Sequence, residues 1–180
     1  DRPMIFAGGG IEVGDTAALK DLAEALDAPT YLNSTARGAL PHGHPLLGIH
    51  TRSRAFAGTD LVLALGVDWD FRTGYGAKIA ADATVVQIDA EPTRLGWNRP
   101  AHHAVVANPG RVVTQLRELA AGFAHGGDRP WRAEIMAVEA ERLAAAESEA
   151  ADDSSPVMPQ RVGKTGDRKS TRLNSSHSSV

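Results

Sequence analysis

The sequence predicts an α/β fold with a doubly wound, mainly parallel sheet, on the strength of three observations. Short apolar runs at residues 4–7, 60–66 and 83–89 have the length of strands that are covered on both faces. An amphipathic helical pattern separates the first run from a further short strand at residues 29–32. Strands that alternate with helices pair in parallel and are joined by right-handed crossovers.

Composition sets the broad class of protein. The 180 residues match the size of one domain, and 42% hydrophobic with 23% charged residues is typical of a globular protein. The absence of cysteine excludes disulfides and thiolate metal sites, and it favours a cytoplasmic location. A net charge of −3 without a basic stripe argues against a nucleic-acid partner. No membrane span and no signal peptide are predicted.

The first strand runs directly into Gly8, Gly9 and Gly10. Glycines at the carboxyl end of a strand allow the backbone to approach a ligand beside a helix N-terminus. Gly8 and Gly10 match the start of the G-x-G-x-x-G dinucleotide fingerprint, but Val13 takes its third position and Asn33 replaces the expected acid. The turn therefore predicts contact with a phosphate or ribose, and a tight turn without a ligand is the alternative.

The helix after this turn is expected to be capped by Asp15, with an apolar stripe of Leu19, Leu22, Ala23 and Leu26. Residues 33–53 form a long irregular connection, of the kind that is usually functional or mobile. A helical turn is expected at residues 54–58, a short helix at 91–95 and a short strand at 104–106.

Two further helices are expected near the end of the chain. Asn108 and Pro109 are typical of a helix start, and the buried face of that helix is expected to hold Val112, Val113, Leu116, Leu119, Ala120 and Phe123. The last helix covers residues 130 to about 150 and is apolar at Trp131, Ile135 and Val138.

Charged residues follow two of the strands. Asp68 and Asp70 are interpreted as a solvated, ion-paired loop rather than an acid–base pair, because Arg72 lies close to them. The guanidinium of Arg72 has the fork geometry that suits a phosphate or a ring edge. Asp89 ends its strand, where a carboxylate either accepts ribose hydroxyls or caps the following turn. The loop histidines lack metal-ligand spacing, so the sequence assigns no metal ligand and no catalytic residue.

Four stretches carry a resemblance to a known family: RPMIFAGGGI, PTYLNSTARGALPHGHPLLGIH, DLVLALGVDWDFRTGYG and VVQIDAEPTRLGWNR. In this order they resemble the Rossmann-like central domain of thiamine-diphosphate-dependent enzymes, above all acetolactate synthase large subunits. The resemblance implies a central nucleotide-binding-like domain at residues 1–125 and a helix and linker at 126–155. Residues 156–166, which include PVMPQRV, resemble the start of a truncated C-terminal domain.

The resemblance implies a fragment of a homodimeric or homotetrameric enzyme that acts on 2-keto acids as a carboligase or decarboxylase. Thiamine diphosphate and Mg²⁺ would be bound by the missing domains, and the fragment alone would be inactive. In this family the central domain holds FAD, ADP or neither. The positions that match its contacts are Gly8, Gly9, Gly10, Thr35, Gly66, Arg72 and Asp89.

Two other functions and one anomaly remain from the sequence. A stand-alone nucleotide-binding module is one alternative, and a sirtuin-like NAD-dependent deacylase is another, because GGGI and DFR resemble motifs of that family. Those motifs lie close together in sirtuins, whereas Gly10 and Asp70 are far apart here.

Residues 167–180, beginning DRKSTRLNSSH, resemble the in-frame translation of a sequencing adapter, and we expect them to be an artefact.

Overall fold

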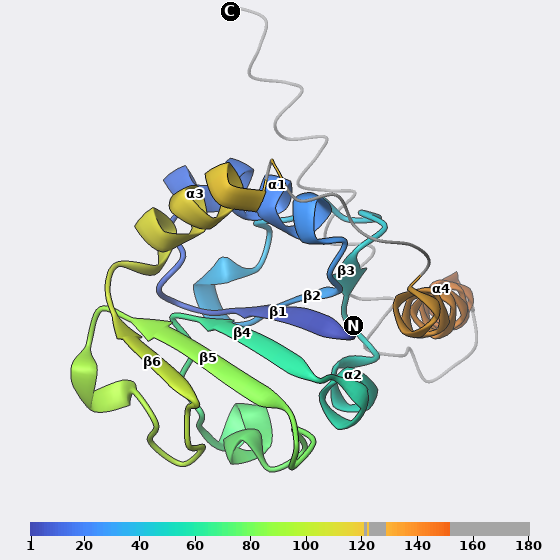
Figure 1. Cartoon of the computed structure of the whole chain (residues 1–180). Helices are drawn as coiled ribbons and strands as arrows, with labels where there is room; N and C mark the ends of the chain where they lie inside the picture. The colour runs from blue at the N-terminus through green and yellow to red at the C-terminus, as the bar shows by residue number, and fades with distance from the viewer. Residues whose placement is uncertain (121, 123–128, 152–180) are drawn as a thin grey trace, which may run out of the picture. The chain divides into compact units, whose positions relative to one another are not determined.

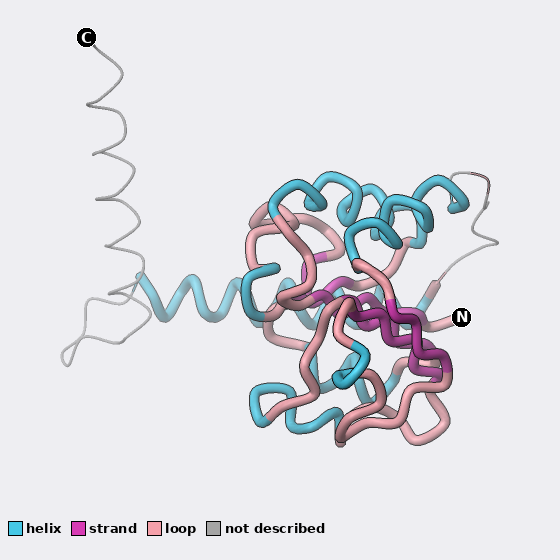
Figure 2. The backbone as a smooth tube through the Cα atoms, turned by 90° about the vertical axis from the view of Figure 1, so that its left-hand side faces the viewer, coloured by secondary structure: helices cyan, strands magenta, loops and turns pink. Residues whose placement is uncertain are grey.

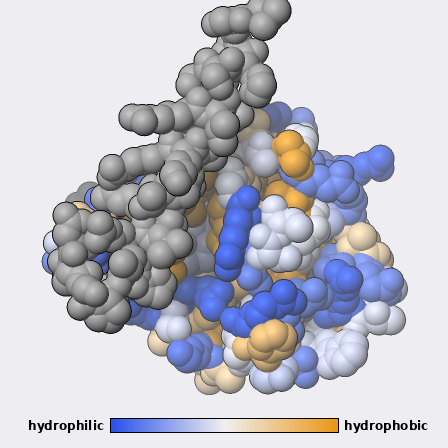
Figure 3. All heavy atoms as spheres, turned by 180° about the vertical axis from the view of Figure 1, so that it is seen from behind, coloured by the Kyte–Doolittle hydropathy of each residue, from blue (hydrophilic) through white to orange (hydrophobic). Residues whose placement is uncertain are grey.

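The computed structural model of the chain describes residues 1–120, 122 and 129–151 (Figure 1). Phe123, the stretch at 156–166 and the adapter-like residues 167–180 lie outside the described residues. None of the helices within the described ranges is long and apolar enough to span a membrane. The rear face in Figure 3 is mixed, with hydrophobic residues in small separate patches among hydrophilic ones.

Six parallel strands form one sheet in the order β3-β2-β1-β4-β5-β6. Their bounds are β1 Pro3–Ala7, β2 Thr30–Leu32, β3 Leu47–Gly48, β4 Leu61–Leu65, β5 Thr84–Asp89 and β6 His103–Val106. The chain builds outward from β1 to β3, returns to place β4 on the other side of β1, and builds outward again. This is the Rossmann strand order, and it confirms the predicted doubly wound fold. The short strand β3, inside the long connection, was not predicted.

The helices cover the two faces of the sheet. In Figure 1, α1 (Thr16–Leu26) and α3 (Pro109–Ala120) lie over one face, and α2 (Arg52–Gly58) lies against the other. The last helix is α4, Pro130–Ala151. Short 3₁₀ turns follow the strands or precede helices, at η1 Val13–Asp15, η2 Ser34–Ala36, η3 Phe71–Gly76 and η4 Pro92–Arg94.

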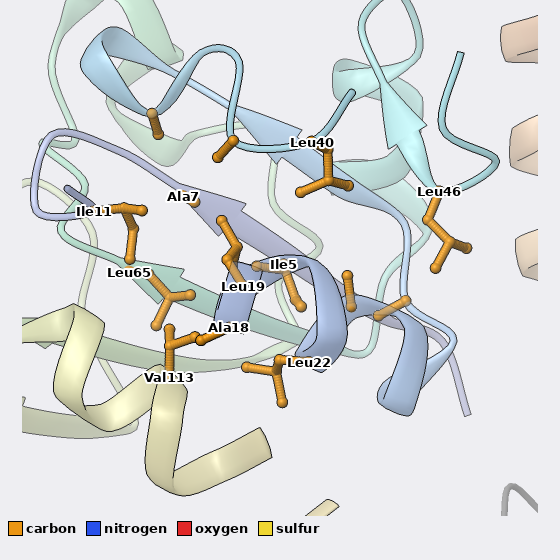
Figure 4. Close-up of a cluster of buried hydrophobic side chains, with 14 of the residues drawn as sticks. Ile5, Ala7, Ile11, Ala18, Leu19, Leu22, Leu40, Leu46, Leu65 and Val113 are labelled. Carbon is orange, nitrogen blue, oxygen red and sulfur yellow. The ribbon is translucent and has the colours of Figure 1, made fainter. Parts of the chain in front are cut away.

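The first core cluster lies between the sheet and the α1–α3 layer. Ile5 and Ala7 point from β1 toward Leu19 and Leu22 of α1, as Figure 4 shows. Leu65, Ile88 and Val113 complete this cluster. Because side chains alternate along a strand, every second residue of β1 enters it. The predicted stripe of α1 is confirmed at Leu19, Leu22 and Ala23, which are all fully buried, while Leu26 is partly buried.

The second core cluster lies on the opposite face and is rich in aromatic rings. Phe6 of β1 meets Phe56 edge-on at 5.2 Å and stacks on Trp69 at 5.7 Å between ring centroids. Ile135 of α4 is buried in the same cluster, and Trp131 is packed against it. The first turns of α4 therefore belong to the core of the sheet domain. Figure 2 shows helices above the strands, and loops and short helical segments below them.

Two local predictions, at Leu119 and Asp15, need correction. Leu119 is 69% exposed, because the buried stripe of α3 runs through Val113 and Ala120 and Leu119 lies off it. Asp15 precedes α1 but does not cap it, since its carboxylate instead accepts the amide of Glu12 at 3.0 Å. On α4, Val138 is only half-buried and its neighbour Glu139 is buried. The predicted cap at Asn108 is confirmed by a 3.0 Å bond from the amide of Arg111.

Candidate functional site

The carboxyl ends of the strands meet at one rim, which faces the viewer in Figure 2. The strand register pairs Ala7 with Leu65 and Leu65 with Ile88. The next residue of each segment, Gly8, Gly66 and Asp89, therefore lies beside the others at the rim. The chain reverses its direction of winding between β1 and β4. A doubly wound sheet binds ligands at this switch point, outside the carboxyl ends of its strands.

The glycine turn and the end of β4 touch backbone to backbone. The amide of Gly8 donates to the carbonyl of Leu65 at 2.9 Å, and that of Gly10 donates to Gly66 at 3.2 Å. A Cβ at Gly66 would lie 2.3 Å from the Cα of Gly10. These two amides are therefore already paired, which supports the tight-turn interpretation at Gly8 and Gly10. Gly9 is exposed and lies beside Thr35, and a ligand contact at these two residues stays a prediction.

Two hollows flank this turn along the rim. The β2–β3 hollow, about 600 Å³, is lined by Tyr31, Leu32, Arg37, Gly38, Leu47, Gly48, Ile49, His50, Arg52 and Ser53. The β4–β5 hollow, about 450 Å³, is lined by Asp68, Trp69, Asp70, Glu91, Thr93, Arg94, Trp97 and Asn98. The rim thus offers two concave regions, one on each side of the switch point, and Gly8, Gly9 and Gly10 line neither of them.

The two hollows differ in charge. Arg37 and Arg52 line the β2–β3 hollow, and neither forms a salt bridge within the described part of the chain. Arg52 instead donates from Nη2 to the carbonyl of Arg72 at 3.0 Å and lies 5.8 Å over the ring of Phe6. Three carboxylates (Asp68, Asp70 and Glu91) and one guanidinium (Arg94) line the β4–β5 hollow. The first hollow therefore favours an anion, and the second favours groups that donate hydrogen bonds.

Arg72 is held by its neighbour Asp70. Its Nε donates to Asp70 Oδ2 at 2.8 Å and its Nη2 lies 2.6 Å from the same oxygen. Burial alone would raise the pKa of Asp70, but the hydrogen bonds from Arg72 outweigh it and lower the pKa. Asp68 pairs with Arg94 at 3.4 Å. The ion-paired interpretation of this loop is confirmed, and a ligand role for Arg72 stays a prediction.

Asp89 uses only one of its two carboxylate oxygens. The side chain is 4% exposed, and Oδ1 accepts the amide of Glu91 at 2.9 Å. The cap of the following turn is not Asp89 but Glu91, whose carboxylate accepts the amide of Thr93. Oδ2 is buried and has no hydrogen-bond partner in the described structure. An unpaired buried acceptor is costly, so each such atom calls for a donor from elsewhere. A ribose hydroxyl is one such donor, and a ribose contact at Asp89 stays a prediction.

Trp69 has an unpaired hydrogen-bond donor, as Asp89 has an unpaired acceptor. Its Nε1 is buried and unpartnered within the described residues, and the residue lines the β4–β5 hollow. Two of the loop histidines have partners from other parts of the chain: His44 Nε2 lies 3.1 Å from Glu24, and His102 Nδ1 accepts the amide of Val85. Among the described residues, no three His, Asp or Glu side chains are placed to hold a metal ion.

Sequence reasoning missed the residues around the β2–β3 hollow. Arg37 and Arg52 lie in or beside the irregular stretch at 33–53, which returns to the rim only because β3 pairs with β2. Glu139 was missed because it lies in an Ala/Glu-rich helix segment that resembles a solvated surface. Its carboxylate accepts the amides of His50 and Thr51, each at 2.9 Å, and the hydroxyl of Thr51 at 2.6 Å.

The stability of the domain is expected to depend on the ionisation of Glu139. Burial alone would raise its pKa, but hydrogen bonds from the Thr51 hydroxyl and from the amides of His50, Ile49 and Thr51 lower it below the ordinary value of 4.5. A carboxyl whose pKa is lower in the folded state stabilises the fold above the unfolded pKa. This stabilisation disappears as the pH falls through the folded pKa.

Urea unfolding of the wild type and of Glu139→Gln across a series of pH values tests this dependence. We expect the wild type to be more stable by about 1–3 kcal/mol at neutral pH. The difference should shrink as the pH falls below the ordinary carboxyl range. A difference that stays constant down to acid pH would contradict this role of the ionised carboxylate.

Fold and rim together define a Rossmann-type α/β domain with hollows on both sides of its topological switch point. Residues 1–116 match the family described as thiamine pyrophosphate enzyme, central domain. The chain belongs to this family.

Curated relatives point in the same direction. The chain is 36% identical over 124 residues to the acetolactate synthase large subunit of Buchnera aphidicola subsp. Schlechtendalia chinensis, covering 64% of this chain and 22% of that protein. It is 33% identical over 165 residues to an acetolactate synthase large subunit of Mycobacterium tuberculosis, covering 89% of this chain and 29% of that protein. It is 31% identical over 172 residues to the glyoxylate carboligase of Escherichia coli O157:H7, covering 90% of this chain and 29% of that protein. The chain thus spans less than a third of the length of these relatives.

Proposed function

We propose that the chain is the central part of a thiamine-diphosphate-dependent enzyme that acts on 2-keto acids, as an acetolactate-synthase-like carboligase or decarboxylase. Family membership and the names of the relatives support this proposal. Flanking domains would hold thiamine diphosphate and Mg²⁺, and the cofactor would supply the ylid that attacks the keto carbon. This chain would supply a scaffold in a cytoplasmic homodimer or homotetramer, and it would be inactive alone.

The reading frame on either side of this sequence tests the enzyme assignment. Coding sequence for flanking α/β domains would support it, and the complete protein should then convert a 2-keto acid when thiamine diphosphate and Mg²⁺ are added. Stop codons next to this segment would instead support the stand-alone nucleotide-binding module. Family membership favours the enzyme over the sirtuin-like alternative.

Within this enzyme, the rim would bind a nucleotide, either FAD or ADP. The observation that carries this assignment is Oδ2 of Asp89, which has no hydrogen-bond partner among the described residues. Because this atom is inaccessible to solvent and Asp89 lines neither hollow, a ribose hydroxyl would have to displace the atoms that cover it. The charges along the rim agree with it, since a diphosphate would be attracted by Arg37 and Arg52 in the β2–β3 hollow. Gly9 lies in the turn after β1 and beside Thr35 of η2, and both would contact the nucleotide.

Titration of the chain with ADP, followed by calorimetry, tests the groove. We expect Arg52→Ala and Asp89→Asn each to weaken ADP binding about tenfold, because each removes a charged partner worth about 1.4 kcal/mol or more. Arg54→Ala is the matched control, since Arg54 lies on the same helix and pairs with Glu134 outside the hollow. Its affinity for ADP should stay within about twofold of the wild type.

Failure of the wild type to bind ADP or FAD, in the chain and in the complete enzyme, would remove the groove from the proposal. The enzyme assignment would stand in that case, because it depends on the family and not on the rim. Equal losses in Arg52→Ala and Arg54→Ala would show that general charge, rather than the hollow, attracts the nucleotide.

A further inference from the structure

One buried carboxylate supports the wall of the β2–β3 hollow without lining it. Glu139 is 4% exposed and comes from α4, far along the chain from the hollow. Its Oε1 accepts the amide of His50 at 2.9 Å, and its Oε2 accepts the amide of Thr51 at 2.9 Å and the Thr51 hydroxyl at 2.6 Å. Both amides belong to the segment that leads from β3 into α2.

The hydrogen bonds continue from Thr51 to the floor of the hollow. The hydroxyls of Thr51 and Tyr31 lie 2.8 Å apart. Because Thr51 gives its single hydroxyl proton to the carboxylate, Tyr31 must donate to Thr51. Tyr31 lines the hollow, and its ring fills the space where Gly48 would carry a Cβ. Burial raises the pKa of Tyr31 to about 12, so it remains a donor at neutral pH.

The position of Arg52 depends on this arrangement. Arg52 follows Thr51 directly and begins α2, so the two amides held by Glu139 set where its side chain leaves the backbone. Beyond the backbone, the contacts of the guanidinium within the described part of the chain are the carbonyl of Arg72 and the face of Phe6. A side chain with few contacts of its own is positioned by the rigidity of the segment that carries it.

We propose that Glu139 is a positioning residue for anion binding in the β2–β3 hollow, and that it acts by fixing residues 50–52 and thereby Arg52. This inference rests on the proposed nucleotide groove and adds to it a residue outside the hollow. It makes α4 a structural part of the groove, although α4 contributes no residue to the lining.

The sign of the effect separates positioning from simple charge. Glu139 is an anion that contacts the residue next to Arg52, so by charge alone it opposes the binding of another anion. If charge dominated, Glu139→Gln would bind ADP more tightly. If positioning dominates, the same variant binds ADP more weakly. The backbone that carries Arg52 is then no longer held in place, and ordering the Arg52 side chain on binding costs free energy.

The experiment compares ADP affinity in the full chain for the wild type, Glu139→Gln and Glu134→Gln, under conditions where far-ultraviolet circular dichroism shows all three to be folded. Glu134 is the matched control, since it lies on the same helix, is exposed and pairs with Arg54. We expect Glu139→Gln to weaken ADP binding about fivefold or more and Glu134→Gln to change it less than twofold. Amide hydrogen exchange across residues 49–53 should accelerate only in Glu139→Gln.

A second pair of variants covers the case in which Glu139→Gln does not fold. Thr51→Val removes the hydroxyl between Tyr31 and Glu139, whereas Thr51→Ser keeps it. We expect Thr51→Val to weaken ADP binding and Thr51→Ser to retain wild-type affinity. Unchanged or tighter binding in folded Glu139→Gln, or equal affinities in the two Thr51 variants, would overturn the inference alone. A wild type that binds no ADP would overturn the groove itself, and the inference with it.

Discussion

Gly66→Ala is expected to destabilise the domain by about 3 kcal/mol or more, or to prevent folding. Gly66 has a φ of +58°, which disfavours any residue with a Cβ. The added Cβ would also lie 2.3 Å from the Cα and 2.5 Å from the nitrogen of Gly10, and these are backbone atoms that no rotamer change can move. The substitution must therefore separate β1 from β4 at the rim and break the bond from the Gly10 amide to the Gly66 carbonyl.

Gly96→Ala is the matched control for this prediction. Gly96 has a φ of +74°, but a Cβ there would meet no atom within 4 Å. It should therefore show only the cost of the left-handed backbone, about 1–2 kcal/mol. Urea unfolding followed by circular dichroism measures both variants. Equal losses in the two would show that the close approach of the rim segments contributes nothing.

Phe6→Ala is expected to destabilise the domain by about 3–5 kcal/mol. The ring is fully buried and contacts Phe56 edge-on at 5.2 Å and Trp69 face-on at 5.7 Å. Its removal leaves a cavity in the middle of the aromatic cluster, which the flanking strands prevent from collapsing. The ring also lies under Arg52 and against Trp69, which line the two different hollows. We therefore expect a loss of ADP affinity in the folded fraction of this variant.

The exposed ring of Phe71 provides the comparison. Phe71 is 73% exposed and its ring contact is with Arg72, at 5.5 Å. Phe71→Ala should change the free energy of unfolding by no more than about 0.5–1 kcal/mol. The free energies of unfolding come from urea titrations of both variants, with Phe6→Leu as a milder core change. A Phe6→Ala loss no larger than that of Phe71→Ala would show that the aromatic cluster does not stabilise the fold.

Local patterns in the sequence were enough for most of the sheet. The runs that became β1, β4 and β5 are apolar and continuous because helices or loops cover both of their faces, and this pattern needs no knowledge of distant residues. The stripe of α1 and the cap at Asn108 are equally local, since each depends on residues within a few positions. The strand β3 escaped prediction because two residues carry no periodicity.

The candidate site was only partly visible from the sequence. Gly66 and Asp89 could be placed at the rim because each ends a strand that the sequence predicts. The sequence could not show whether the amides of the glycine turn are free to bind a ligand, because the hydrogen bond from the Gly10 amide to Gly66 joins segments that are distant in the chain. The same holds for Arg52, whose place at the rim depends on the pairing of β3 with β2.

By itself, the sequence determined the class of fold, the position of the glycine turn and the resemblance to thiamine-diphosphate enzymes. These depend on short stretches whose chemistry is the same wherever they lie. Only the tertiary structure decided that Gly8 and Gly10 use their amides on the neighbouring strand, that one oxygen of Asp89 is left unpaired, and that Glu139 holds the start of α2. Each of these depends on whether a distant partner comes within hydrogen-bonding distance. Folding brings such partners together, whereas residue spacing along the chain does not reveal them.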